Sequence, residues 1–117
     1  MSETYNLYRQ GRAHLDAGLN AQATVALEKA KRREPEKASI REALGIAYFR
    51  IRRFAEAEHE FRAILEGQPV DDYAHFALAR CLEKQGRPEE AVGHYKMATF
   101  LRPQSLEYRK ALDALRG

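Results

Sequence analysis

Three of the four prolines in this 117-residue chain are evenly spaced along it. Pro35, Pro69 and Pro103 follow one another with a constant period, because 69 − 35 and 103 − 69 both equal 34. Pro88 lies outside this spacing. A period of about 20 to 50 residues indicates tandem copies of one supersecondary unit, so an internal repeat is the first hypothesis to test.

Residue sizes recur with the same period. When the chain is shifted by one period, small residues align with small ones and large residues with large ones. The small positions hold Gly11, Gly45 and Ala79 and, further along each copy, Ala23, Ala57 and Ala91; a large position holds Leu27, Phe61 and Tyr95. Two helices approach closely only where their side chains are small, so the alignment predicts the same helix pair three times.

Hydrophobic periodicity assigns helices to these copies. In the middle copy, Leu44, Tyr48 and Ile51 recur at the spacing of one helical face. No sustained alternation of apolar and polar residues and no Asn-Gly or Asp-Gly turn supports a strand. We therefore expect an all-α chain, with helix pairs at Thr4–Ala17 and Ala21–Arg33, at Ala38–Ile51 and Ala55–Glu66, and at Asp72–Gln85 and Glu89–Leu101.

Glycines follow the first helix in two of the three copies. Gly18 and Gly86 suit the left-handed backbone conformation that commonly closes a helix. Arg52 holds the equivalent place in the middle copy, and because it is less suited to a positive φ we expect that turn to differ. After Pro103, a single apolar face predicts an amphipathic helix at Ser105–Arg116 that covers the end of the last copy.

This repeated pattern resembles the tetratricopeptide repeat, and the resemblance covers Thr4 to Arg102 as three tandem copies. It implies a right-handed superhelical α-solenoid of three helix-turn-helix repeats with a capping helix. One domain would occupy residues 1–117, with repeats at about 4–37, 38–71 and 72–105 and the capping helix at about 105–116. The resemblance also implies a protein–protein interaction module, an adaptor or scaffold that binds a partner peptide or segment in a concave groove.

In this family the first helices of successive repeats line the groove. At the corresponding positions this chain carries aromatic residues and arginines, which are enriched at binding hot spots. The candidate partner-binding residues are Tyr5, Tyr8, Arg12, Ile46, Phe49, Arg50, Tyr73, Phe76, Arg80 and Lys84. The alternative is that the aromatic side chains among them pack between neighbouring first helices.

The wider groove is mildly positive. Its five cationic and three anionic side chains give a net charge of +2, which favours an acidic partner or a C-terminal carboxylate. These are Arg9, Arg12, Arg50, Arg80 and Lys84 against Asp16, Glu42 and Glu83. Some relatives clamp the C-terminal carboxylate of heat-shock chaperones, but only Arg12 suits a carboxylate here, so that co-chaperone role is not supported. The other corresponding positions hold Tyr8, Ala43, Tyr73 and Ala77.

Nucleic-acid binding is a weaker alternative. The formal charge of +3 is small for a dedicated nucleic-acid-binding protein. The one basic cluster consists of Lys29, Lys31, Arg32 and Arg33. It complements the dipole at the end of a helix, is expected to be solvated, and has no interleaved aromatic residues on which bases could stack.

Catalysis has little support in the sequence. The four histidines are His14, His59, His75 and His94, and none pairs with another at the i, i+4 spacing of a helical metal site. The single cysteine, Cys81, aligns with small residues in the other copies and is expected to be a buried, inert thiol. No phosphate-binding glycine loop or nucleophile elbow occurs, so we expect no enzyme, no cofactor and no metal.

The chain has no segment with the pattern of a secretory signal or of a membrane span of roughly 18 residues. We therefore expect a cytoplasmic protein, monomeric or weakly homo-oligomeric, that binds a protein or peptide partner and no membrane. Self-association through the first copy is an alternative function. Gln10 stands there where Leu44 and Leu78 stand in the other copies, and no copy precedes it.

Overall fold

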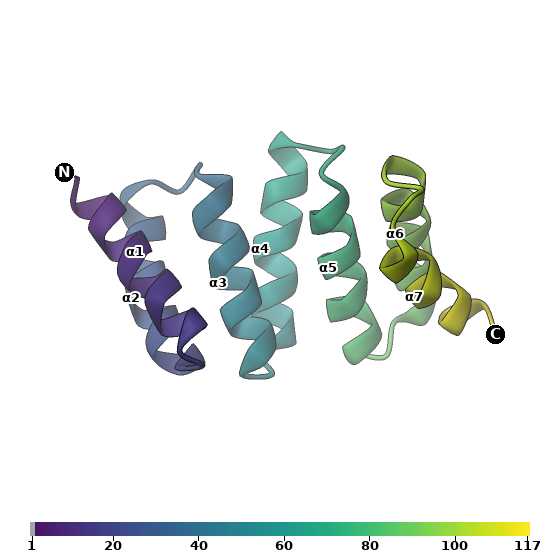
Figure 1. Cartoon of the computed structure of the whole chain (residues 1–117), viewed down its shortest axis with the longest axis horizontal. Coiled ribbons are helices and arrows are strands. Elements are labelled where there is room, and N and C mark those ends of the chain that lie inside the picture. Colours follow the sequence, from purple (N-terminus) through teal and green to yellow (C-terminus); the bar gives the residue numbers. More distant parts are fainter. Residues whose placement is uncertain (1) are drawn as a thin grey trace. The chain divides into compact units, whose positions relative to one another are not determined.

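The computed structural model describes residues 2–117, and every regular element in that range is an α-helix. The helices are α1 (Glu3–Asp16), α2 (Asn20–Arg33), α3 (Ala38–Arg50), α4 (Phe54–Gly67), α5 (Asp72–Lys84), α6 (Pro88–Leu101) and α7 (Leu106–Arg116) (Figure 1). All seven predicted helices are confirmed, and each observed end lies within one residue of its expected position.

The chain divides into two compact units, Met1–Glu60 and Phe61–Gly117, and the boundary falls inside α4. Unit 1 contains α1, α2, α3 and the first half of α4; unit 2 contains the second half of α4 and α5 to α7. The expected single domain over residues 1–117 and its repeat boundaries remain predictions.

Unit 1 is built on the close approach of α1 and α2. A Cβ atom added to Gly11 would lie 2.4 Å from Cγ of Leu27, whose side chain is fully buried. No side chain larger than hydrogen fits there unless Leu27 moves, which explains why the first copy carries glycine at this position. α3 then packs against α2 and contributes the buried side chains of Ile40, Leu44 and Tyr48 to the same core.

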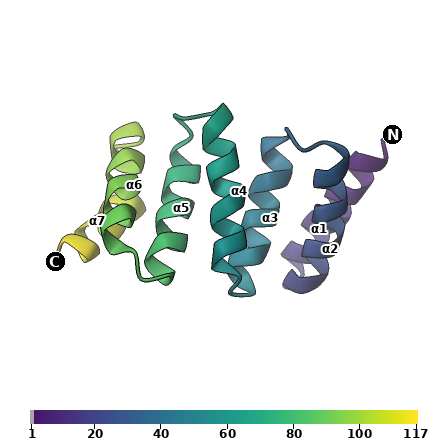
Figure 2. The ribbon, with the colours of Figure 1, turned by 180° about the vertical axis from the view of Figure 1, so that it is seen from behind.

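Unit 2 repeats the helix pair and adds α7. α5 and α6 enclose buried Leu78, Leu82 and Tyr95, and α7 packs alongside α6 (Figure 2). The amphipathic face of α7 supplies Tyr108, whose ring stacks on Phe76 with centroids 4.8 Å apart. Cys81 is buried, as expected from its alignment with small residues.

The turns after α1, α3 and α5 share one backbone geometry. Gly18, Arg52 and Gly86 have φ values of 77°, 66° and 74°. Their backbone N–H groups donate to the carbonyls three residues earlier at 3.0, 3.0 and 3.1 Å. The expectation that the Arg52 turn differs is therefore wrong.

The hydrogen bonds that close the helix and start the next one require a left-handed residue, whatever its type. For a residue with a Cβ this conformation costs about 1–2 kcal/mol, which the packing of the flanking helices outweighs. The guanidinium of Arg52 also lies over the ring of Phe54, 5.3 Å from its centroid.

Candidate functional site

The predicted groove residues of the first repeat lie along α1. Ser2 caps this helix by accepting a hydrogen bond from the Tyr5 backbone N–H at 3.0 Å, which fixes the first turn. The Tyr5 side chain is 46% exposed, and the guanidinium of Arg9 lies 5.7 Å from its ring centroid. Tyr8 and Arg12 follow on the same face and are half-buried. α1 therefore presents an aromatic and cationic face.

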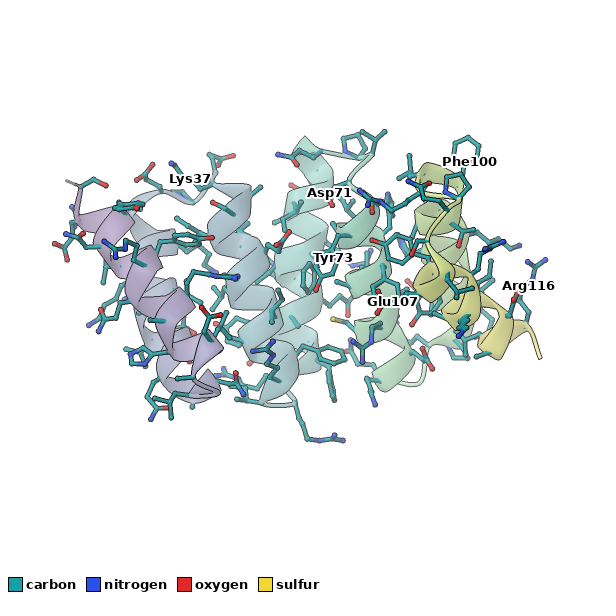
Figure 3. The ribbon with its side chains drawn as sticks, viewed as in Figure 1. Lys37, Asp71, Tyr73, Phe100, Glu107 and Arg116 are labelled. Atoms are coloured by element: carbon teal, nitrogen blue, oxygen red, sulfur yellow. The ribbon has the colours of Figure 1, made fainter. Side chains whose placement is uncertain are left out.

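A pocket of about 250 Å³ lies beside Tyr5 and Tyr8 in unit 1. Its lining consists of Ser2, Thr4, Tyr5, Tyr8, Glu34, Lys37, Ser39 and Ile40. Two predicted groove residues are therefore brought together with the α2–α3 loop and the first turn of α3. The exposed ammonium of Lys37 (labelled in Figure 3) lies at this pocket and pairs only weakly, at 3.9 Å, with Glu34.

Sequence reasoning missed Lys37 because it stands in a loop, outside the helices that family resemblance assigns to the groove. The signal that could have found it is its position directly before α3, where the loop closes on the first turn of α1. No side chain caps the start of α3 at Lys37, so the positive end of that helix dipole adds to the ammonium charge.

The predicted groove residues on α3 are partly exposed and partly engaged in contacts with other side chains. Ile46 and Phe49 are half-buried, and the Phe49 ring meets Phe54 edge to face at 5.1 Å. Arg50 is exposed, but its guanidinium donates to the Leu15 carbonyl at 3.3 Å and to Asn20 Oδ1 at 3.4 Å. Arg50 thus ties α3 to the α1–α2 turn as well as lying at the surface.

In unit 2 the predicted residues lie on α5. Asp71 caps this helix by accepting from the Ala74 backbone N–H at 2.9 Å. Tyr73 (Figure 3) is 36% exposed and contacts the rings of Phe61 and Phe76, with centroids 6.2 and 6.4 Å away. Arg80 lies two turns further along and is exposed, and Lys84, on the last turn, is exposed too.

Phe76 is a correction to the predicted groove. Its side chain is only 6% exposed and packs against Tyr95 and Tyr108, with ring centroids 5.7 and 4.8 Å away. The cause is α7, which brings Tyr108 over α5 and donates its hydroxyl to Asp72 at 2.7 Å. The packing alternative therefore holds for this aromatic residue, and Phe76 belongs to the core of unit 2.

Three buried tyrosines in the two units each donate a hydrogen bond to a carboxylate. Tyr95 donates to Glu83 at 2.8 Å and Tyr108 donates to Asp72, while Tyr48 donates to Glu28. Burial, followed by the bond to the carboxylate, raises the pKa of each phenol well above its usual range. These hydroxyls remain neutral donors near pH 7, so they hold the helices together and are unsuited to act as bases.

Glu60 is the most buried acidic side chain of unit 1, at 2% exposed. It accepts hydrogen bonds at 2.8 Å from Lys31 of α2 and at 2.8 Å from Arg41 of α3. Lys31 was expected to belong to a solvated basic cluster, and that expectation is wrong. Its ammonium neutralises a buried acid, which leaves Lys29, Arg32 and Arg33 as the exposed cations of that cluster.

Two features are absent from residues 2–117. No three or more His, Cys, Asp or Glu side chains of this part of the chain are grouped so that they could hold a metal ion. Within the same range, no helix is both long and apolar enough to cross a membrane.

The two units consist of antiparallel helix pairs that recur with the period of the prolines, so the chain is an all-α protein of the helical-repeat solenoid class. A family model described as tetratricopeptide repeat matches residues 8–65 and again residues 43–105. Together these matches cover most of the sequence, and the chain belongs to the tetratricopeptide repeat family. This family is typically non-catalytic and binds other proteins.

Solved structures show the same fold. The first such domain of Spaghetti (RPAP3), bound to the HSP90 peptide SRMEEVD, matches with a TM-score of 0.92 at 20% identity, over 97% of this chain and 90% of that one. The corresponding domain of human RPAP3 matches with a TM-score of 0.88 at 20% identity, over 97% and 89% of the two chains.

MamA from Desulfovibrio magneticus matches with a TM-score of 0.93 at 19% identity. The match covers 97% of this chain but 64% of that one, so the chain spans less than two thirds of MamA's length. No significant match was found among curated proteins.

Proposed function

We propose that this protein binds an acidic peptide or an acidic segment of a partner protein and acts as an adaptor or scaffold. The proposed contacts come from two surfaces. The unit 1 surface consists of Tyr5, Tyr8, Arg12, Ile46, Phe49, Arg50 and Lys37, and the unit 2 surface consists of Tyr73, Arg80 and Lys84.

The observation that carries this proposal is the recurrence of one tyrosine–arginine pair in the first and third repeats. Tyr5 and Tyr73 occupy the same repeat position, since 73 − 5 is twice 34, and both are exposed on the first turn of a helix. Arg12 and Arg80 recur in the same way, two turns further along. An exposed tyrosine offers a large apolar face and a hydroxyl, and the arginine offers two donors to a carboxylate, so together they suit an acidic segment.

The charge of the two surfaces supports the same class of partner. They carry the cations Arg12, Lys37, Arg50, Arg80 and Lys84, and the wider groove, with Asp16, Glu42 and Glu83 included, keeps a positive balance. The neighbouring RPAP3 domain is bound to a peptide whose sequence, SRMEEVD, is rich in acidic residues. At 20% identity that likeness shows the fold alone, so the peptide serves here as a probe of the charge preference.

The test measures binding of fluorescent SRMEEVD and of SRMQQVN, in which amides replace the three acidic side chains, by anisotropy. We expect the acidic peptide to bind more tightly, and the double substitution Tyr5→Ala with Tyr73→Ala to weaken its binding by about tenfold or more. The matched control is Phe100→Ala, which removes an aromatic ring that is 80% exposed on α6 (Figure 3). Equal affinity of the double variant and the control, with both folded by circular dichroism, would contradict the proposal.

Self-association through the first repeat is the second candidate. A pocket of about 240 Å³ lies on α1 and α2, lined by Leu7, Gln10, His14, Gln22, Val25, Ala26 and Lys29. Val25 is 57% exposed beside it. Val25→Glu should abolish any dimer seen by sedimentation velocity, and a chain that stays monomeric to about millimolar concentration would exclude this candidate.

The protein's activity and its cellular compartment complete the proposal. We infer a non-catalytic protein of the cytoplasm, where its single cysteine would stay reduced. A nucleic-acid-associated role is disfavoured further because Lys31 of the basic cluster is bound to Glu60.

A further inference from the structure

His75 on α5 and His94 on α6 meet inside unit 2. Their Nδ1 atoms are 3.0 Å apart, and Nε2 of His75 lies 2.8 Å from the Pro69 carbonyl oxygen. The ring centroids are 5.3 Å apart and the planes differ by 24°. The distance between the two centroids equals the Nδ1–Nδ1 distance plus one ring radius for each ring. The two rings therefore lie end to end and meet at their Nδ1 atoms.

The Pro69 carbonyl determines the tautomer of His75. A carbonyl oxygen only accepts hydrogen bonds, so Nε2 of His75 carries the proton and donates it. In the neutral ring Nδ1 then has a free lone pair, which accepts the Nδ1 proton of His94. Two imidazoles thus share one proton between lone pairs that point at each other.

The repeat shows what this pair replaces. His75 and His94 stand one period after Arg41 and Glu60, and Pro69 stands one period after Pro35. Arg41 likewise donates to the Pro35 carbonyl, at 2.9 Å, and to Glu60. The ion pair of Arg41 and Glu60 in unit 1 is therefore replaced in unit 2 by His75 and His94, whose side chains are of a type that binds metals. In both units one member of the pair donates a hydrogen bond to a proline carbonyl.

We propose that His75 and His94 form a binding site for a divalent transition-metal ion of the nickel, copper and zinc group, with both Nδ1 atoms as ligands. This inference is independent of the proposed peptide binding. Imidazole nitrogens suit these ions, and a ligand histidine usually donates its other N–H to a carbonyl or carboxylate, as His75 does to Pro69.

The observed distance is close to what an ion needs. Tetrahedral zinc with bonds of about 2.0–2.1 Å places two nitrogen ligands roughly 3.3 Å apart. The Nδ1 atoms at 3.0 Å need to separate by only a few tenths of an ångström. His94 is half-buried, so its ring is the one that can turn, and solvent can reach the ion to complete its coordination.

Binding is balanced in protons when both rings start neutral. The proton between the two Nδ1 atoms leaves, and the ion takes its place between the lone pairs. Solvent water accepts that proton and another proton from water binds Nε2 of His94, so this ring changes tautomer and both rings remain neutral ligands with an Nε2–H.

No pair of histidines at i, i+4 spacing indicates this site in the sequence. The two histidines belong to neighbouring helices and are separated by 19 positions in the chain. The signal that could have found them is their alignment with Arg41 and Glu60, since residues at contacting positions in one repeat contact each other in the next.

The test is calorimetric titration of the untagged chain with ZnCl2, NiCl2, CuCl2 and MgCl2. We expect one ion per chain for the three transition metals, the tightest binding for copper, and none for magnesium. His94→Ala should weaken zinc binding by at least about tenfold, whereas the matched control His59→Ala, an exposed histidine, should not change it.

A direct measurement covers the case in which His94→Ala fails to fold. Two-dimensional ¹H–¹⁵N spectra of the histidine rings of the unsubstituted chain should show the Nδ1 signals of His75 and His94 shifting together as zinc is added. Absence of stoichiometric binding at about millimolar zinc, binding unchanged in His94→Ala, or shifts at His14 or His59 instead would each overturn the proposal.

Discussion

The two units use one scaffold to bury different polar chemistry. In unit 1, Glu60 is held by Lys31 and Arg41, and in unit 2 the equivalent positions of Glu60 and Arg41 hold His94 and His75. The position of Lys31 is taken by Leu65, one period later. Both arrangements are anchored on a proline carbonyl, which accepts from Arg41 at 2.9 Å in unit 1 and from His75 at 2.8 Å in unit 2.

The comparison shows how a repeat protein can vary its interior without changing its helices. A buried charge requires its partners, so the unit 1 cluster is sensitive to loss of any one cation. The equivalent pair in unit 2 consists of two imidazoles, which are the ligands of the proposed metal site.

The largest expected effect comes from removing a partner of the buried acid. Arg41→Leu leaves Glu60 with one cation and the Pro35 carbonyl without its donor, and should lower the free energy of unfolding by about 3 kcal/mol. Urea denaturation measures it. Lys37→Ala is the control, because it removes an exposed pair at 3.9 Å and should cost less than about 1 kcal/mol. Equal effects for the two would show that burial does not matter here.

The second largest effect is expected at Gly11, where two helices of unit 1 lie in close contact. Gly11→Ala places a Cβ atom 2.4 Å from Leu27 Cγ and should destabilise by about 2 kcal/mol through overpacking. The equivalent residue in unit 2 is already Ala79, fully buried. Ala79→Gly should therefore cost only about 1 kcal/mol, mainly through helix propensity. Thermal unfolding distinguishes them, and a neutral Gly11→Ala would show that Leu27 moves freely.

The smallest expected change in stability distinguishes the turn at Arg52 from the turn at Gly86. Arg52→Gly relieves the left-handed strain but loses the contact with Phe54, and should stabilise by about 0.5 kcal/mol. The reciprocal change Gly86→Arg in unit 2 should destabilise by about 1 kcal/mol. Midpoints of urea denaturation report both, and the same sign for the two substitutions would refute the strain argument.

Much of the fold was predictable because it depends on local pattern. The spacing of Leu44, Tyr48 and Ile51 alone places a helix face, and the proline period places the helix ends. Gly11 and Cys81 were correctly assigned to close contacts, since size alone decides them. The candidate surface was predicted in part. Tyr5 and Tyr73 are exposed as a surface requires, and their role in binding remains a proposal.

Sequence pattern is enough to assign the helical repeat, its helices and its family, because apolar residues recur on one face of every helix. The contacts of individual side chains depend instead on how the helices pack. Phe76 is buried because Tyr108, from a helix outside the repeat pattern, covers it. Lys31 binds Glu60 although 29 positions separate them in the sequence, and His75 contacts His94 across 19 positions. Helix packing brings the members of each pair together. Such pairings depend on which surfaces face each other, and no local pattern contains that information.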